Sequence, residues 1–252
     1  MTCLLAMTPI SCYHPSGDLA FSVHKNSLEE DSTLAFALGS AETQENISLF
    51  FKDLHRVGEQ VMQCFAIALQ IPDSEGGMNY FSDKHPWSES SGTMLRFHHY
   101  PQQSNNPGVP LAGCHSDYGS VTILIQKDIP GLEVKAYRSH NDQTDVPWIS
   151  APVIPETLLI NIGDAMQMWT NGLLKSTKHR VVYHPAQQTQ PRYSIACFLQ
   201  LSDDTRFHPV PSPLISNLNE GCEDENALCM TAKEYLQYKL EMTYGNLMKS
   251  IK

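Results

Sequence analysis

The residues with the clearest chemical potential are His115 and Asp117, which directly precede an apolar segment rich in β-branched residues (121–125). Side chains two positions apart on an extended chain point to the same face, so both can reach one point. An imidazole nitrogen and a carboxylate oxygen together suit a divalent first-row metal. The pair therefore predicts a metal site that needs a further ligand. The alternative is a simple turn before a strand, in which Asp117 caps the local backbone.

The third ligand in this interpretation is His179, which opens the β-branched run 179–182. Two histidines and one carboxylate that leave coordination positions open form the facial triad of non-haem Fe(II) oxygenases. The alternative for His179 is a core histidine bonded to a carbonyl. Four other histidines compete as donors, and they are His98, His99, His184 and His208. His184 lies five positions after His179 and would face away from it on a continuous strand.

Arg192 and Ser194 form a second pair that shares one face of a predicted strand. The apolar residues 195–199 follow directly, which indicates that this strand is partly buried. A buried guanidinium needs an anion, and an Arg with a neighbouring hydroxyl suits a carboxylate. An ordinary surface salt bridge is the alternative for Arg192.

The order of these motifs resembles that of the Fe(II)/2-oxoglutarate-dependent dioxygenases of the isopenicillin-N-synthase-like group. Four further blocks agree with this resemblance and occur in the family's order, at 130–134, 161–164, 169–172 and 175–181. A lone His-x-Asp carries little information, whereas several ordered blocks around it are specific. The resemblance extends over residues 46–250 and does not include the earlier part of the chain.

The resemblance implies that His115, Asp117 and His179 bind Fe(II). It also implies that 2-oxoglutarate and O₂ are co-substrates. Arg192 and Ser194 then bind the distal carboxylate of 2-oxoglutarate. The resemblance also implies that Tyr100 and His98 contact the co-substrate. It implies as well that Arg96 and Phe198 line the substrate pocket.

The block around Tyr100 departs from the family's usual text. Relatives commonly have Asn-Tyr-Tyr-Pro, and this chain has His-His-Tyr-Pro at 98–101, so His98 stands where the asparagine would be. An imidazole can still donate a hydrogen bond, but it adds a group that titrates near neutral pH. Packing is the alternative role for Tyr100, and equally for Arg96 and Phe198. Residues 161, 163, 164, 171 and 172 are interpreted as turn residues without chemistry.

The predicted function is that of a non-haem Fe(II) dioxygenase, which couples oxidative decarboxylation of 2-oxoglutarate to hydroxylation or desaturation of a small organic substrate. Two alternatives are an oxidase of the same fold that needs no 2-oxoglutarate, and a catalytically impaired jelly-roll binding protein. A third is a zinc hydrolase with the same three ligands. The Arg192 and Ser194 pair argues against the oxidase and the hydrolase.

Composition limits the class of protein. The chain has 252 residues, 41% of them hydrophobic, which is sufficient for one packed core. A formal net charge of −10 argues against nucleic-acid binding. The seven cysteines form no Cys-x-x-Cys pair, which favours reduced thiols and a cytoplasmic location. No apolar run reaches the roughly 18 residues that span a bilayer, so we expect no membrane partner.

The elements that must position these residues are mainly β. Strands are expected at 93–100, 121–126, 132–137, 157–162, 165–169, 179–183 and 193–199, with a loop at 101–113. Short strands separated by Pro and Gly, with few helices, predict a mainly β fold with flanking helices, a double-stranded β-helix or jelly roll. Its open end brings distant strands together, so His179 can meet His115.

Residues 46–252 are expected to form the dioxygenase domain, with its core at 92–202. A helical buttress at 46–70 is predicted to start at a capping Asn46, and a C-terminal helix at 231–249 carries a capping box of Thr231 and Glu234. Residues 1–45 are expected to be irregular and atypical relative to the resembled family. Without the strands that relatives have there, the sheet would keep an unpaired edge and the pocket would be more open to water. We therefore expect either low stability with a high ratio of 2-oxoglutarate consumed to product formed, or a partner chain that covers the edge.

Overall fold

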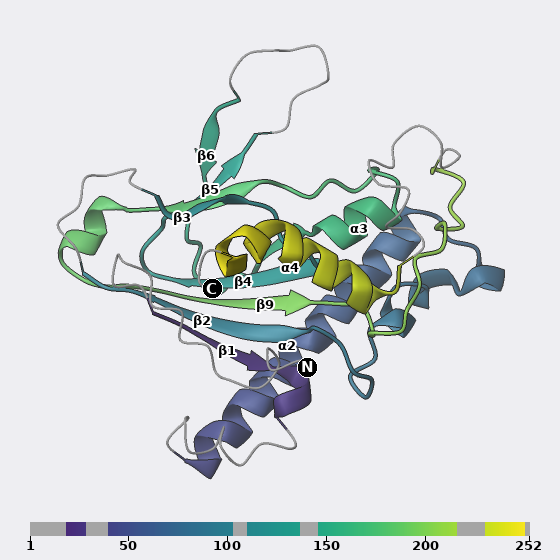
Figure 1. Cartoon of the computed structure of the whole chain (residues 1–252), viewed down its shortest axis with the longest axis horizontal. Coiled ribbons are helices and arrows are strands. Elements are labelled where there is room, and N and C mark those ends of the chain that lie inside the picture. Colours follow the sequence, from purple (N-terminus) through teal and green to yellow (C-terminus); the bar gives the residue numbers. More distant parts are fainter. Residues whose placement is uncertain (1–18, 29–39, 103–109, 137–145, 216–229, 250–252) are drawn as a thin grey trace.

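The computed structural model describes residues 19–28, 40–102, 110–136, 146–215 and 230–249. Within these ranges nine strands pair into two antiparallel sheets (Figure 1), one with the order β1-β2-β9-β4-β7 and one with the order β3-β8-β5-β6. The strands are β1 Leu19–His24, β2 Met94–Tyr100, β3 Pro110–His115, β4 Val121–Lys127, β5 Leu132–Lys135, β6 Trp148–Ser150, β7 Leu159–Ile162, β8 His179–Val182 and β9 Arg192–Leu199. This is the mainly β, two-sheet arrangement that the sequence predicts.

Helices flank the sheets. The α-helices are α2 Ala41–Ala68, α3 Asp164–Trp169 and α4 Ala232–Lys249, and the 3-10 helices are η1 Lys25–Ser27, η2 Asp73–Glu75, η3 Gly77–Asn79, η4 Ser82–Lys84 and η5 Pro185–Gln188. None of the helices within the described ranges has the length and apolarity needed to cross a membrane.

The five-stranded sheet has one face on the hydrophobic core and one face on the interior between the sheets. Alternation along β2 and β9 places Leu95, Cys197 and Leu199 in the core, packed with α2. The alternate residues, Arg192 and Ser194 among them, point to the opposite face. This alternation therefore places the candidate site residues of β2 and β9 on the same face of the sheet.

Helix α2 supports this sheet, as the sequence predicts. It buries a stripe of residues along its length, which are Phe51, Leu54, His55, Gly58, Met62 and Ala66. Gly58 lies against the Leu199 side chain, where a Cβ would collide with it, so glycine lets the helix approach β9 closely. The helix starts at Ala41 rather than at Asn46, because the Ser40 side chain accepts a hydrogen bond from the Thr43 amide and caps it.

The strand predicted at 165–169 is wrong, because these residues form helix α3. Its buried residues, Ala165, Met166 and Trp169, follow helical spacing, and Gly163 in an extended conformation precedes the first turn. A five-residue segment in which four residues are apolar does not by itself distinguish a buried strand from a short helix. The Trp169 indole donates to the His208 carbonyl over 2.8 Å, which anchors the end of the helix.

The loop predicted at 101–113 is partly wrong, because β3 begins at Pro110. Residues 103–109 lie outside the described residues. Strand β3 pairs with β8 through two shifts in register, and its side chains show no alternation of buried and exposed positions. Strand β6, which pairs with β5 at the sheet edge, was also not predicted. Neither strand shows the alternation of apolar and polar residues from which strands are predicted, so the sequence does not indicate them.

The expectation that residues 1–45 are irregular also needs correction, because Leu19–His24 is a strand. It pairs with β2 over six residues and extends the sheet. Lys25 follows directly and is buried, and its ammonium group donates to the carbonyl oxygens of Pro86 and Glu89. The edge that was expected to be unpaired therefore carries an additional strand. Residues 1–18 and 29–39 lie outside the described residues.

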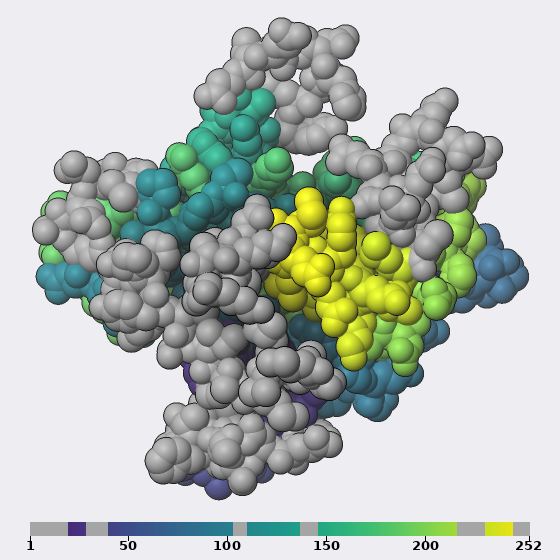
Figure 2. All heavy atoms as spheres, in the orientation of Figure 1, coloured from purple at the N-terminus to yellow at the C-terminus, as the bar shows by residue number. Residues whose placement is uncertain are grey.

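Helix α4 begins where the sequence predicts. The Thr231 hydroxyl accepts from the Glu234 amide, and the Glu234 carboxylate accepts from the Thr231 amide over 2.8 Å, which is the expected capping box. In the space-filling view α4 is the yellow ridge on the surface of the molecule (Figure 2).

Candidate active site

Pairing of β3 with β8 brings the two candidate histidines together. His115 ends β3, His179 begins β8, and the two are partners across the ladder. Their ring centroids are 4.4 Å apart. Two residues far apart in the sequence thus become neighbours through strand register.

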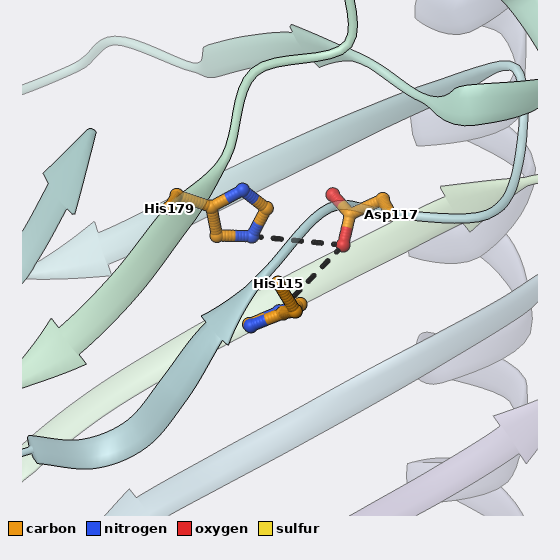
Figure 3. Close-up of side chains that lie close together, drawn as sticks. All are labelled: His115, Asp117 and His179. Carbon is orange, nitrogen blue, oxygen red and sulfur yellow. Dashed lines mark ion pairs between the residues drawn. The ribbon is translucent and has the colours of Figure 1, made fainter. Parts of the chain in front are cut away.

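Asp117 completes the group from the loop between β3 and β4 (Figure 3). Its Oδ1 lies 3.6 Å from His179 Nε2 and 4.0 Å from His115 Nε2. Among the described residues this is the one set of three metal-ligand side chains whose donor atoms lie within 4.8 Å of one another. Asp117 is buried, whereas the His115 side chain is 47% exposed. The group is therefore open to solvent on the His115 side.

The far nitrogen of each ring is held by the backbone. His115 Nδ1 donates to the Gly113 carbonyl over 2.7 Å, and His179 Nδ1 donates to the Thr177 carbonyl over 3.0 Å. A neutral imidazole that donates from Nδ1 presents the lone pair of Nε2. These bonds orient both rings so that each Nε2, the atom left for a metal, faces Asp117.

The other carboxylate oxygen of Asp117 is held by two side chains. Thr122 Oγ1 donates to Oδ2 over 2.7 Å, and Asn161 Nδ2 donates to the same atom over 2.8 Å. These two residues are paired partners on β4 and β7. They leave Oδ1 free to meet the histidines. Asn161 was interpreted as a turn residue, and its position in the strand before a Gly-Asp pair was the signal that was missed.

Asp164 links the two segments that carry the metal-ligand candidates, although it was also interpreted as a turn residue. Its Oδ2 accepts from the Ser116 hydroxyl over 3.1 Å, and its Oδ1 accepts from the Ser176 hydroxyl over 2.7 Å. Lys239 on α4 forms an ion pair with it, with 2.7 Å between Nζ and Oδ2. Ser116 lies between His115 and Asp117, so one carboxylate connects both halves of the site to the C-terminal helix.

Arg192 lies on the interior face of β9 and is only 1% exposed. Its Nη1 donates to Ser194 Oγ over 3.2 Å, its Nη2 donates to Gln126 Oε1 over 3.0 Å, and its Nε is buried without a partner. The guanidinium carbon lies 5.1 Å from the centre of the Tyr100 ring. No carboxylate of the described residues pairs with this buried cation, and burial lowers the pKa of Arg192. An anionic ligand would supply the missing charge.

Gly131 provides the space that Arg192 occupies. Its φ of +155° is rare for other residues, and a Cβ there would lie 3.2 Å from Arg192 Nε and 2.9 Å from the Val182 carbonyl oxygen. The glycine in the Pro-Gly-Leu block, which supported the resemblance, is therefore explained by its backbone conformation and by the close approach of Arg192.

His98 lies on the same face, opposite Ser194 on the neighbouring strand. Its ring stacks on Tyr100, with centroids 5.9 Å apart and an interplanar angle of 8°. Burial lowers the pKa of His98 to about 3, and the charges of Arg96 and Arg192 contribute to this shift. His98 is therefore a neutral imidazole throughout the physiological pH range.

Arg96 and Phe198 also lie on this interior face. The Arg96 guanidinium carbon is 5.9 Å from the Phe198 ring centre. The other histidines considered as donors lie elsewhere. His184 caps η5 through its ring, and His99 stacks on Tyr193 on the opposite face of the sheet. His208 is exposed.

Comparison with known proteins identifies the family. The profile of the 2OG-Fe(II) oxygenase superfamily matches residues 91–201. Proline hydroxylase buaE of Petromyces alliaceus is 33% identical over 195 residues, which cover 73% of this chain and 55% of that protein. The 2-oxoglutarate-dependent dioxygenase frbA of Dothideomycetidae sp. is 32% identical over 209 residues, which cover 78% of this chain and 56% of that protein.

A solved structure with the same fold is that of a full-length Neurospora crassa protein in complex with alpha-KG and 5-formyluracil. It superposes with a TM-score of 0.70 at 27% identity, covering 91% of this chain and 70% of that chain. This likeness confirms the predicted jelly roll. The chain spans less than two thirds of the length of the curated relatives above. Together with the group of His115, Asp117 and His179, the matches show that the chain belongs to the 2OG-Fe(II) oxygenase superfamily.

Proposed function

We propose that this protein is a non-haem Fe(II) dioxygenase that couples oxidative decarboxylation of 2-oxoglutarate to hydroxylation or desaturation of a small organic substrate. The observation that carries this proposal is the presence of two complementary features. A two-histidine, one-carboxylate donor group lies where β3 ends and β8 begins in the four-stranded sheet, and a buried Arg192 without an acidic partner among the described residues lies on β9 of the five-stranded sheet.

His115, Asp117 and His179 would hold the metal. Both ring Nε2 atoms and one carboxylate oxygen face a common point, and every other polar atom of the three side chains is already hydrogen-bonded. Nitrogen and oxygen donors with open positions suit Fe(II). When bound, Fe(II) supplies the activation of O₂ that the oxidation needs.

Arg192 and Ser194 would bind the distal carboxylate of 2-oxoglutarate. The guanidinium fork offers parallel N–H donors, and its unpartnered Nε is one of them. Tyr100 packs beside this guanidinium, and His98 stacks on Tyr100 as a neutral donor. Gln126 is an addition to the residues expected from the sequence, because it holds the second terminal nitrogen of Arg192.

Arg96 and Phe198 would contact the organic substrate. They lie on the same interior face as Arg192, further along β2 and β9. A small substrate is supported by the relatives, since one is named a proline hydroxylase and the Neurospora crassa structure contains 5-formyluracil.

The alternatives make different demands on the site. A zinc hydrolase or an oxidase without a 2-oxo acid would have no use for a buried Arg192 that lacks an acidic partner among the described residues. A binding protein without catalysis would not need two backbone-oriented histidines beside an acid whose second oxygen is fixed by Thr122 and Asn161. The donor set and the guanidinium together favour the dioxygenase.

Anaerobic titration of the purified chain with Fe(II) and then 2-oxoglutarate tests the proposal. We expect a weak visible charge-transfer band that forms with both components and is absent with either alone. On admission of O₂, 2-oxoglutarate should be consumed and succinate released. A chain that binds Zn(II) but forms no band with Fe(II) and 2-oxoglutarate would contradict the proposal and favour the hydrolase.

A further inference from the structure

Arg96 is a second cation on the interior face that no acidic side chain among the described residues neutralises. It sits on β2 between Ser22 on β1 and Ala196 on β9, its direct partners in the two neighbouring ladders. Its Nε donates to Ser22 Oγ over 2.9 Å. A guanidinium carries five N–H donors, and this hydrogen bond uses one of them. No other described residue accepts a hydrogen bond from this head group, so its remaining donors can meet a ligand.

The rings beside Arg96 do not compensate its charge. His24, on the same face of β1, has its pKa lowered by burial and then by the charge of Arg96. Burial lowers the pKa of His98, two residues along β2, and the charges of Arg96 and Arg192 lower it further. Both shifts favour the neutral ring, and the charged side chains on this face that cause them are arginines. The interior face around Arg96 therefore has an excess of positive charge.

Strand register connects Arg96 with the proposed metal site. Phe198, whose ring lies beside the Arg96 guanidinium, pairs with Thr122 on β4, and Thr122 donates to Asp117. Arg192 is paired with Tyr100, so Arg192 and Arg96 lie on opposite sides of His98 along the interior face. This separation leaves Arg192 for the co-substrate and assigns Arg96 to a different ligand.

Charge counting indicates what that ligand is. The charges of a divalent metal, of Asp117, of Arg192 and of a dicarboxylate co-substrate cancel one another. One positive charge then remains, and it is on Arg96. A monoanion would neutralise it, whereas a phosphate monoester would bring close to two negative charges. The Phe198 ring, 5.9 Å from the guanidinium carbon, offers an apolar surface next to the charge.

We propose that Arg96 binds the carboxylate of a small monocarboxylate substrate, whose apolar part packs on Phe198. This inference rests on the proposed dioxygenase function, because it places the substrate next to the proposed metal site. It assigns a chemical class to the substrate, which family membership does not. A purely structural Arg96, held by Ser22 and Phe198, would show no preference for anions.

Matched pairs of small molecules test this assignment without turnover. The protein is loaded with Zn(II) and with N-oxalylglycine, an unreactive 2-oxoglutarate analogue that occupies Arg192. Calorimetry then measures dissociation constants for hexanoate, cyclohexanecarboxylate, phenylacetate and 3-phenylpropanoate, and for the primary amide of each acid. Each pair has the same shape and differs in charge.

We expect at least one carboxylate to bind the wild type about tenfold or more tightly than its amide, the usual effect of a charge-assisted hydrogen bond. In Arg96→Gln this ratio should fall to within about twofold, while the affinity for the amide stays the same. Arg96→Lys keeps the charge and should retain part of the preference. Because Arg96→Lys conserves the side-chain length, it also serves if Arg96→Gln does not fold.

Arg56→Gln is the matched control, because Arg56 is exposed on α2 and pairs with Asp53. It removes the same charge from the chain and should leave every ratio as in the wild type. The assignment is overturned if no carboxylate binds better than its amide, or if the preference survives in Arg96→Gln. A wild type that fails to bind N-oxalylglycine would instead refute the proposed function, so the two failures are distinguishable.

Discussion

The Asp164 carboxylate accepts a hydrogen bond from the Ser176 hydroxyl over 2.7 Å, and its other oxygen accepts from Ser116. These contacts connect the chain before His179 with the turn that carries His115 and Asp117. Lys239 joins the same carboxylate from α4, and Tyr118 donates to Thr243 on that helix, so the helix is tied to the site at two points. Asp164 therefore acts as a positioning residue.

Asp164→Asn should weaken metal binding without abolishing the fold. The amide keeps the size of the side chain but loses the charge that faces Lys239, and its nitrogen cannot accept from a serine. Losses of about 10- to 100-fold in metal affinity are usual when outer partners of a metal site are changed. Titration with Co(II) followed by its visible absorption measures the effect.

Asp203→Asn provides the control for that experiment, because Asp203 also accepts from a serine and pairs with a lysine. It should leave the affinity for Co(II) unchanged. Equal losses in both variants would show that Asp164 has no special role.

His179→Ala should abolish stoichiometric Fe(II) binding. It removes one of the three donors and leaves Asp117 Oδ1 without its nearest imidazole, 3.6 Å away. The melting temperature should change little, because the ring makes one hydrogen bond, to a carbonyl two residues away. Equilibrium dialysis with iron analysis gives the stoichiometry. His208→Ala, at an exposed position, should bind as the wild type does, and an unchanged stoichiometry in His179→Ala would remove it from the ligand set.

Arg192→Lys should raise the dissociation constant for 2-oxoglutarate by about tenfold or more, because a lysine keeps the charge but loses the fork. Gln126→Leu should have a smaller effect in the same direction, since it removes the acceptor that orients Nη2. The visible band of the anaerobic complex reports the affinity. Arg56→Lys serves as the control, and wild-type affinity in Arg192→Lys would argue against its role at the co-substrate.

Stability should decrease as the pH falls below 6.5, with a contribution from His85. This ring is buried, with Nδ1 bonded to the Phe81 carbonyl and Nε2 to Ser120 Oγ, and burial lowers its pKa to about 3. Because its folded pKa lies below the unfolded value near 6.5, its contribution is present above pH 6.5 and is lost as pH falls towards 3.

On the scale of 1.36 kcal/mol per pKa unit, His85 should account for a loss of about 1 to 3 kcal/mol in the free energy of unfolding between pH 7.5 and pH 4.5. Urea unfolding at pH 7.5 and pH 4.5 measures it. His85→Gln should be less stable at pH 7.5 and should lose less stability between the two pH values. A slope with pH equal to that of the wild type would show that His85 does not titrate on unfolding.

Residues 19–28 should resist limited proteolysis under native conditions. Strand β1 is paired along its length, and the buried Lys25 ammonium is bonded to two loop carbonyls beside Trp87. Lys25→Met removes those hydrogen bonds and should expose the segment to cleavage. Mass spectrometry of the fragments locates the cuts. Lys233→Met, at an exposed position on α4, is the control, and rapid cleavage within β1 of the wild type would contradict the pairing.

The order of residues along the chain was enough to show which of them share a face, because side-chain direction on a strand repeats every two residues. Arg192 with Ser194 could be paired in this way. His115 and Asp117 were paired by the same argument and do meet, although Asp117 lies in the loop after β3 and not on the strand. The ordered family blocks added His179. Helix α4 could be placed from its capping box, since a cap involves residues only three positions apart.

Contacts between residues remote in the chain came only with the folded structure. Asn161 bonds Asp117, Asp164 bonds Ser176, and Gln126 bonds Arg192 only because strand register and helix placement bring them together. Packing also makes 164–169 a helix, since Met166 and Trp169 bury their side chains at helical spacing. Register and packing depend on the whole core at once, so no local pattern encodes them.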